Sequence, residues 1–81
     1  MKARVTVSPK KTVLDPQGQA IGSALKGRGY VAVAAVRQGK VFEIELVAGA
    51  ERGKVQTEME EIARDILSNP VIEDYRVEIL D

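Results

Sequence analysis

Paired carboxylates are the residues of this chain that come nearest to a catalytic arrangement. Glu43 and Glu45 lie two residues apart and Glu60 and Glu61 are adjacent, so either pair could be read as the acid and base of a proton transfer. Each pair falls on the polar face of its predicted element, beside basic residues and without a predicted pocket. Solvated surface is therefore the favoured interpretation, and we predict no catalytic residue in this chain.

Gly27-Arg28-Gly29 has the look of a phosphate-binding loop. Anions bind where backbone amides open a helix, and these residues follow a predicted helix instead. We interpret them as a helix stop.

Composition excludes several classes of site. The chain contains no cysteine and no histidine, which removes thiol chemistry, thiolate metal ligands, disulfides and the commonest general base. Twelve basic and twelve acidic residues cancel, so no global field attracts nucleic acid or an anionic membrane. We expect no metal and no cofactor on this chain, no nucleic-acid or membrane partner, and a cytoplasmic location because no signal peptide or apolar span is visible.

The 81 residues predict one domain, 1–81, whose single small core favours association with other chains. Alternating residues predict a strand over 2–8, and Asp15-Pro16 marks the cap and first position of a helix that ends near Arg28. Two further strands, 31–36 and 41–47, flank a hairpin connection at 38–40. A helix over 54–67 and a strand over 75–80 complete the chain. The predicted apolar stripe of the second helix is Val55, Met59, Ile62, Ala63, Ile66 and Leu67.

This β-α-β-β-α-β order predicts an α+β, ferredoxin-like fold. Its four-stranded antiparallel sheet would have the order 4-1-3-2 and both helices on one face. The other face would be open, and on it the basic first strand would lie between two acidic strands. The remaining positions of this face are apolar and surrounded by charged residues, which is typical of a protein interface. The candidates for self-association on this face are Arg4, Val41, Glu43, Glu45, Val47, Glu78 and Leu80, to which Ala32, Ala34 and Val36 can be added.

Gly18 and Gly22 form a small-xxx-small step on the predicted helix, and this step fits internal packing and a partner contact equally well.

Two other functions of this fold class were weighed. RNA recognition needs aromatic residues on the central strands, and strand 2–8 has none, so we do not expect it. A free-standing ACT-like regulatory domain that binds a small metabolite remains as an alternative function.

Three segments together resemble PurS, the small subunit of phosphoribosylformylglycinamidine synthase. They are Val13-Leu14-Asp15-Pro16-Gln17-Gly18, then Gly29-Tyr30 ahead of Val36-Arg37-Gln38-Gly39-Lys40, and finally Asn69-Pro70-Val71-Ile72-Glu73-Asp74-Tyr75. The resemblance covers nearly all of the chain.

The resemblance implies a non-catalytic assembly subunit of an ATP- and Mg-dependent, glutamine-hydrolysing ligase of de novo purine synthesis. It further implies partnership with a synthetase subunit (PurL) and a glutaminase subunit (PurQ), between which ammonia passes, and a homodimer that could pair into tetramers. We predict two regions of partner contact on this basis: Asp15, Pro16, Gln17 and Gly18 at the helix start, and Arg37, Lys40, Asp74 and Tyr75 near strand ends.

Overall fold

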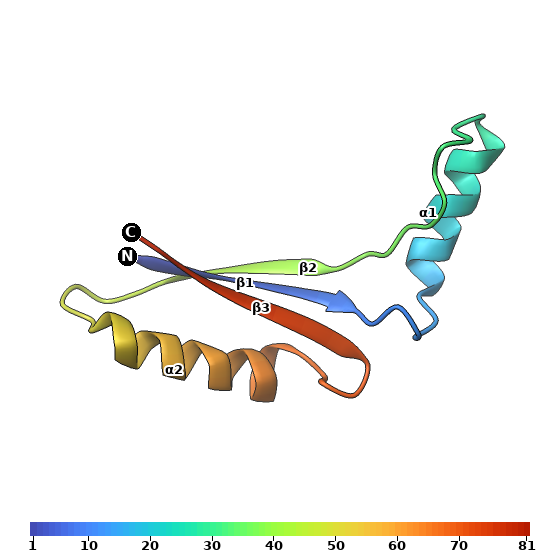
Figure 1. The fold of residues 1–81 in the computed structure, drawn as a ribbon. Coiled ribbons are helices and arrows are strands. Elements are labelled where there is room, and N and C mark those ends of the chain that lie inside the picture. The colour runs from blue at the N-terminus through green and yellow to red at the C-terminus, as the bar shows by residue number, and fades with distance from the viewer.

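The computed structural model describes all 81 residues and has an elongated shape (Figure 1). Its elements, in chain order, are β1 (Lys2–Pro9), α1 (Pro16–Gly27), β2 (Lys40–Glu45), α2 (Arg52–Ile62) with a π-helical turn (Ala63–Leu67), and β3 (Glu73–Leu80). The radius of gyration is 16.2 Å. A compact domain of this length has about 12 Å. The chain is therefore more extended than a compact single domain of its length.

The sheet has three strands in the order β2-β1-β3, all antiparallel. The central strand β1 pairs through Val5 with Phe42 on one side and with Val77 on the other. This order agrees with the predicted neighbours of the first, third and last strands. The prediction of a four-stranded sheet is wrong, because residues 31–36 form no strand.

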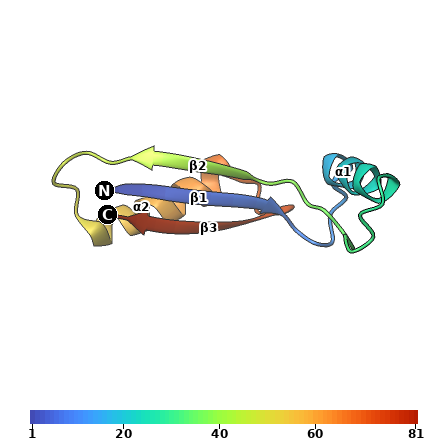
Figure 2. The same cartoon turned by 90° about the horizontal axis from the view of Figure 1, so that it is seen from above.

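Residues 30–39, which we call the arm, run from the end of α1 to the start of β2 without pairing to the sheet. In Figures 1 and 2 the arm continues the line of β2 away from the sheet and reaches α1 at the far end of the molecule. The predicted hairpin at 38–40 is thus opened out. As a consequence α1 does not cover the sheet, and the prediction of two helices on one face is also wrong.

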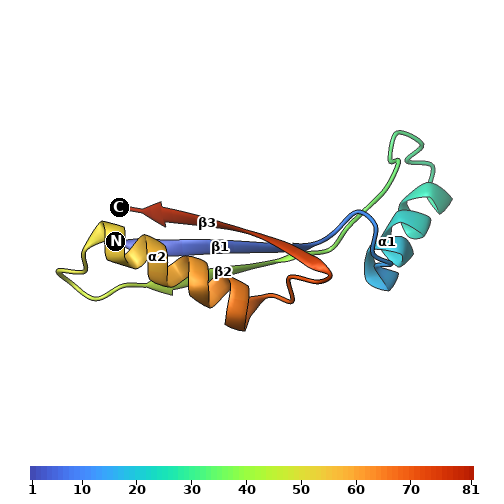
Figure 3. The same cartoon turned by 60° about the horizontal axis from the view of Figure 1, so that its bottom comes forward.

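The core lies between the sheet and α2 alone (Figure 3). Ala3, Val5 and Val7 of β1 are fully buried, and they pack in two clusters with Val55, Met59 and Ala63. Alternation along β1 sends these three side chains to the α2 side, as the sequence pattern predicted. Only 8 of the 81 residues are buried, so this core is small for a chain of such length.

The second helix departs from its predicted stripe near its end. Val55, Met59 and Ala63 are buried as predicted, whereas Ile66 is 74% exposed. The turn that contains Ile66 is π-helical, and such a turn is wider than an α-turn and rotates the following side chains about the helix axis. Leu67 still reaches the core beside Val5 and Val7.

Candidate partner-docking site

Asp15 joins the start of α1 to the end of the arm. It is the N-cap of α1, and its Oδ1 accepts a hydrogen bond from the Gly18 amide at 3.1 Å. Its Oδ2 accepts a second one from the Gln38 amide at 2.8 Å. These bonds, first that of Gln38 and then that of Gly18, hold the pKa of the Asp15 carboxyl below its ordinary value. The predicted cap is confirmed, and it also connects two segments of the chain.

Gly18 explains why this motif needs a glycine. A Cβ at this position would collide with Oδ2 of Asp15 and with the carbonyl oxygen of Val36. One turn later a Cβ on Gly22 would lie 3.8 Å from Cγ2 of Val36, in ordinary contact. The two glycines therefore let α1 approach the arm closely. The small-xxx-small step serves packing within the chain.

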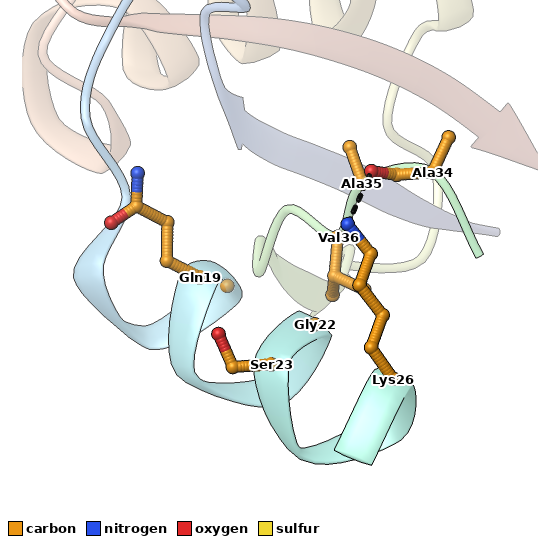
Figure 4. A pocket seen from close by; sticks show the side chains of 8 residues that line it. Gln19, Gly22, Ser23, Lys26, Ala34, Ala35 and Val36 are labelled. Atoms are coloured by element: carbon orange, nitrogen blue, oxygen red, sulfur yellow. Dashed lines mark hydrogen bonds between the residues drawn. The ribbon is translucent and has the colours of Figure 1, made fainter. Parts of the chain in front are cut away.

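An open groove lies between α1 and the arm (Figure 4). Its volume is about 290 Å³, and Lys26 crosses it to donate a hydrogen bond to the carbonyl oxygen of Ala34 at 3.5 Å. The helix ends next to it as predicted, because the Arg28 amide donates to the carbonyls of Ala24 and Leu25 and Gly29 takes a positive φ of 92°. The groove is lined mostly by small and polar residues, among them Ser23 and Lys26.

The two predicted contact regions meet at one place, the narrow connection between the sheet and the unit formed by α1 and the arm. Val7 of β1 lies between Lys40 on β2 and Tyr75 on β3. Next to it, Arg37 donates to the carbonyl of Pro9 at 3.4 Å, and Lys10 forms an ion pair with Asp74 at 3.1 Å. Sequence reasoning treated these regions as separate, since nothing in their spacing shows that they are adjacent.

The predicted residues differ in how freely a partner can reach them. Pro16, Gln17, Arg37, Lys40 and Asp74 are exposed, whereas Gly18 is buried. The Lys40 ammonium lies 5.9 Å from the centroid of the Phe42 ring, a cation–π contact on the sheet. Tyr75 is half-buried and packs against the cluster of Val5, Val7 and Ala63, so it has a core role.

The face of the sheet opposite α2 carries the predicted charge pattern. Arg4 lies between Glu43 and Glu78 in register, and Lys2 lies between Glu45 and Leu80. Lys2 forms an ion pair with Glu43 at 3.2 Å, and Arg76 forms one with Glu78 at 3.6 Å. No helix covers this face (Figure 3). A self-association role for these residues remains a prediction.

Four apolar positions of that predicted face lie elsewhere, and two of them, Ala32 and Ala34, are in the arm, which pairs with no strand. Val47 follows the end of β2 and is highly exposed, so it belongs to the loop before α2. Val36 packs against Gly22 of α1 and is not on the open face of the sheet. The sequence analysis also missed the free edge of β2, because it paired this strand with residues 31–36. The apolar run at 31–36 fits a strand, but it does not identify the strand with which it pairs.

The whole chain contains neither a metal centre nor a membrane span in its structure. No three acidic side chains gather where they could hold a metal ion. None of the helices combines the length and the apolar character that a membrane crossing requires.

Comparison with known proteins identifies relatives along the full length. Residues 2–81 match the family model "PurS: Phosphoribosylformylglycinamidine (FGAM) synthase". The chain is 41% identical over 78 residues to the synthase subunit PurS of Bacillus subtilis, covering 96% of this chain and 90% of that protein. It is 38% identical to PurS of Methanocaldococcus jannaschii, covering 96% and 93%.

Solved structures show the same likeness. A crystal form of B. subtilis PurS superposes with a TM-score of 0.83 at 39% identity, over 99% of this chain and 98% of that one. A chain of the structure described as PurLQS from Thermotoga maritima superposes with a TM-score of 0.83 at 29% identity, covering 98% and 95%. The open arrangement of sheet, arm and α1 is thus similar to that of solved proteins.

Proposed function

Because this chain belongs to the PurS family of FGAM synthase, an ATP-dependent ligase, we propose that it is the non-catalytic assembly subunit of that enzyme. In this role it joins a synthetase subunit (PurL) to a glutaminase subunit (PurQ). The synthetase converts formylglycinamide ribonucleotide to formylglycinamidine ribonucleotide with ATP and Mg, and the glutaminase supplies ammonia from glutamine. This chain binds none of these cofactors and acts in the cytoplasm.

The observation that carries this proposal is the match to a chain of the PurLQS structure over 98% of the present chain. The geometry of the molecule supports it. The exposed candidate residues gather where α1 and the arm project from the sheet, and neither of the carboxylate pairs lies in a pocket lining. Such a protein can fix the distance between two active sites, which supplies proximity without bond-making groups.

The decisive experiment compares two nitrogen sources. Synthetase and glutaminase subunits from the same source are assayed for FGAM formation with and without this chain, first with glutamine and then with ammonium chloride. We expect omission of the chain to abolish most glutamine-dependent synthesis and to leave ammonium-dependent synthesis largely unchanged. Glutamine-dependent synthesis that is equally fast without the chain would refute the role.

A matched binding assay tests the alternative of a metabolite-binding regulator. Titration of the isolated chain with amino acids and nucleotides should show no saturable heat of binding. A saturable response, together with unimpaired synthesis in the absence of the chain, would favour the regulatory domain.

A further inference from the structure

Charge is divided unevenly between the two ends of this molecule. Residues 10–40, which contain α1, the arm and their connections to the sheet, hold six lysine and arginine residues and a single acidic residue, Asp15. The remaining residues hold six basic and eleven acidic ones. Because α1 projects away from the sheet (Figure 1), the positive charge is also separated in space from the acidic remainder. The neutral total therefore conceals a basic projection, and the field of such a region attracts acidic groups.

A groove runs along this projection between α1 and the arm. Its first part is the hollow of Figure 4, beside Ser23 and Lys26. A second hollow of about 440 Å³ adjoins it and extends past Gln19 to Lys11 and Arg37. Three residues, Gln19 among them, line both hollows, so the two form one groove with a cation at each end.

The cations of this groove have no acidic partner within the chain. Lys11 forms neither a hydrogen bond nor an ion pair, and Lys26 and Arg37 reach only backbone carbonyls, at 3.5 Å and 3.4 Å. The one carboxylate in the lining, Asp15, uses both of its oxygens for backbone amides. Three exposed positive charges therefore remain available to a ligand, and that ligand should be anionic.

The spacing of the charges indicates the form of the ligand. Lys26 follows Gln19 by seven helical residues, so the two ends of the groove lie about 10 Å apart along α1. Two acidic side chains three residues apart in an extended peptide span about the same distance. A compact anion would reach one end of the groove only, whereas an extended acidic segment can contact both.

The groove is also separate from the apolar side of α1. Gly18 and Gly22 face the arm, and helical geometry places Ser23 on one side of this contact and the partly exposed Ile21 on the other. A contact that buried Ile21 would therefore leave the groove accessible. We propose that the groove binds an extended acidic segment of a synthase subunit that this chain assembles. The inference rests on the proposed assembly role and names the chemistry by which one partner is recognised.

Neutralisation of the two lysines tests the groove in the full chain. The purified synthetase and glutaminase subunits are titrated separately and together with the chain, in the presence of ATP, Mg and glutamine. In the variant Lys11→Gln with Lys26→Gln, we expect the Kd for at least one subunit to rise at least about tenfold, because carboxylates of the partner would lose their cations. The Kd of the natural chain should also rise more steeply with salt than that of the variant.

Two control variants separate the groove from total charge and from folding. Lys54→Glu changes the net charge by the same amount on exposed α2, where Lys54 has no ion pair. Lys11→Arg with Lys26→Arg keeps both positive charges. Each control should keep the Kd within about twofold of the natural value, and circular dichroism should show the same helix content in all variants.

Carbodiimide cross-linking identifies the occupant. This reagent joins a lysine amine to a carboxylate only where the two are in direct contact, and mass spectrometry locates the new amide bond. In the assembled synthase we expect Lys11 and Lys26 to be joined to aspartate or glutamate residues of a single segment of one partner subunit. Lys54 should form no such bond.

An unchanged Kd for the Lys→Gln double variant would overturn the groove proposal and leave the assembly role standing. The same holds if Lys11 and Lys26 are joined only to another copy of this chain. If the natural chain binds neither subunit, the assembly role is refuted and the groove proposal fails with it.

Discussion

The carboxylate of Asp15 accepts hydrogen bonds from two backbone amides, that of Gly18, three residues away, at 3.1 Å and that of Gln38, 23 residues away, at 2.8 Å. Through the second bond the start of α1 is tied to the end of the arm. The helix and the arm are therefore one structural unit, although α1 makes little contact with the sheet.

These two hydrogen bonds to Asp15 predict an acid-sensitive contact between α1 and the arm. The folded-state pKa of Asp15 is lowered, chiefly by Gln38, so its contribution to stability is present above the unfolded pKa and is lost as pH falls through the folded value. We expect thermal stability to decline below about pH 4 and the decline to be shallower in Asp15→Asn. Calorimetry from pH 6 to pH 3 measures this. Asp65, whose pKa is lowered mainly by a side-chain bond from Arg64, provides the control variant Asp65→Asn. Because this bond joins adjacent residues and can also form in the unfolded chain, Asp65→Asn should change the acid decline less than Asp15→Asn does.

A pair of glycine variants tests the close approach of α1 to the arm. Gly18→Ala adds a Cβ that meets Asp15 and the Val36 carbonyl, and should cost about 1–3 kcal/mol of stability through overpacking. Gly53→Ala lies in α2 with no atom within 4 Å of the new Cβ, and should stabilise the protein by about 0.5–1 kcal/mol. Urea unfolding gives both values. An equal effect at the two positions would show that α1 is not held against the arm.

The π-helical turn predicts different costs for two side chains on the same predicted stripe. Met59 is 5% exposed in the core, so Met59→Ala should lower the free energy of unfolding by about 2–5 kcal/mol. Ile66→Ala should change it by less than about 0.5 kcal/mol, because this side chain is already in water. Denaturant midpoints at fixed protein concentration measure the difference. A large loss for Ile66→Ala would place that residue in a buried contact.

Charge reversal tests the row of Glu43, Arg4 and Glu78 across the open face. Arg4→Glu would set three acidic side chains in neighbouring register positions and should cost about 1 kcal/mol. The double variant Arg4→Glu with Glu43→Arg should recover part of that loss; recovery is partial because Glu43 also pairs with Lys2 at 3.2 Å. A double-mutant cycle with both single variants isolates the coupling. Additive losses would mean that the row makes no electrostatic contribution.

Local features were predictable because they depend on neighbours in sequence. Asp15-Pro16 identified the start of α1, and the Gly27 to Gly29 stretch identified its end. Alternation assigned Val5 to the covered face and Arg4 to the open one, as the register confirms. The position of Ile66 could not be predicted, since a π-turn leaves the apolar pattern of the sequence unchanged.

Predictions about the candidate site had a similar limit. Asp15 and Arg37 were selected as separate contact residues, and only the folded chain places both at the connection between the sheet and α1. Tyr75 was open to a core or an interface role, and its packing against Val7 assigns it to the core. The contact partners of a residue far away in sequence are not encoded in its own spacing.

Sequence patterns alone located the two helices and the three paired strands, and alternation along β1 identified the side chains that face the core. Only the folded chain shows that residues 31–36 do not join the sheet and that α1 therefore lies apart from it. Alternation in a sequence specifies which faces a strand presents, but it does not specify which strand lies beside it. The backbone hydrogen bonds of an extended segment are satisfied equally well by its own chain or by another.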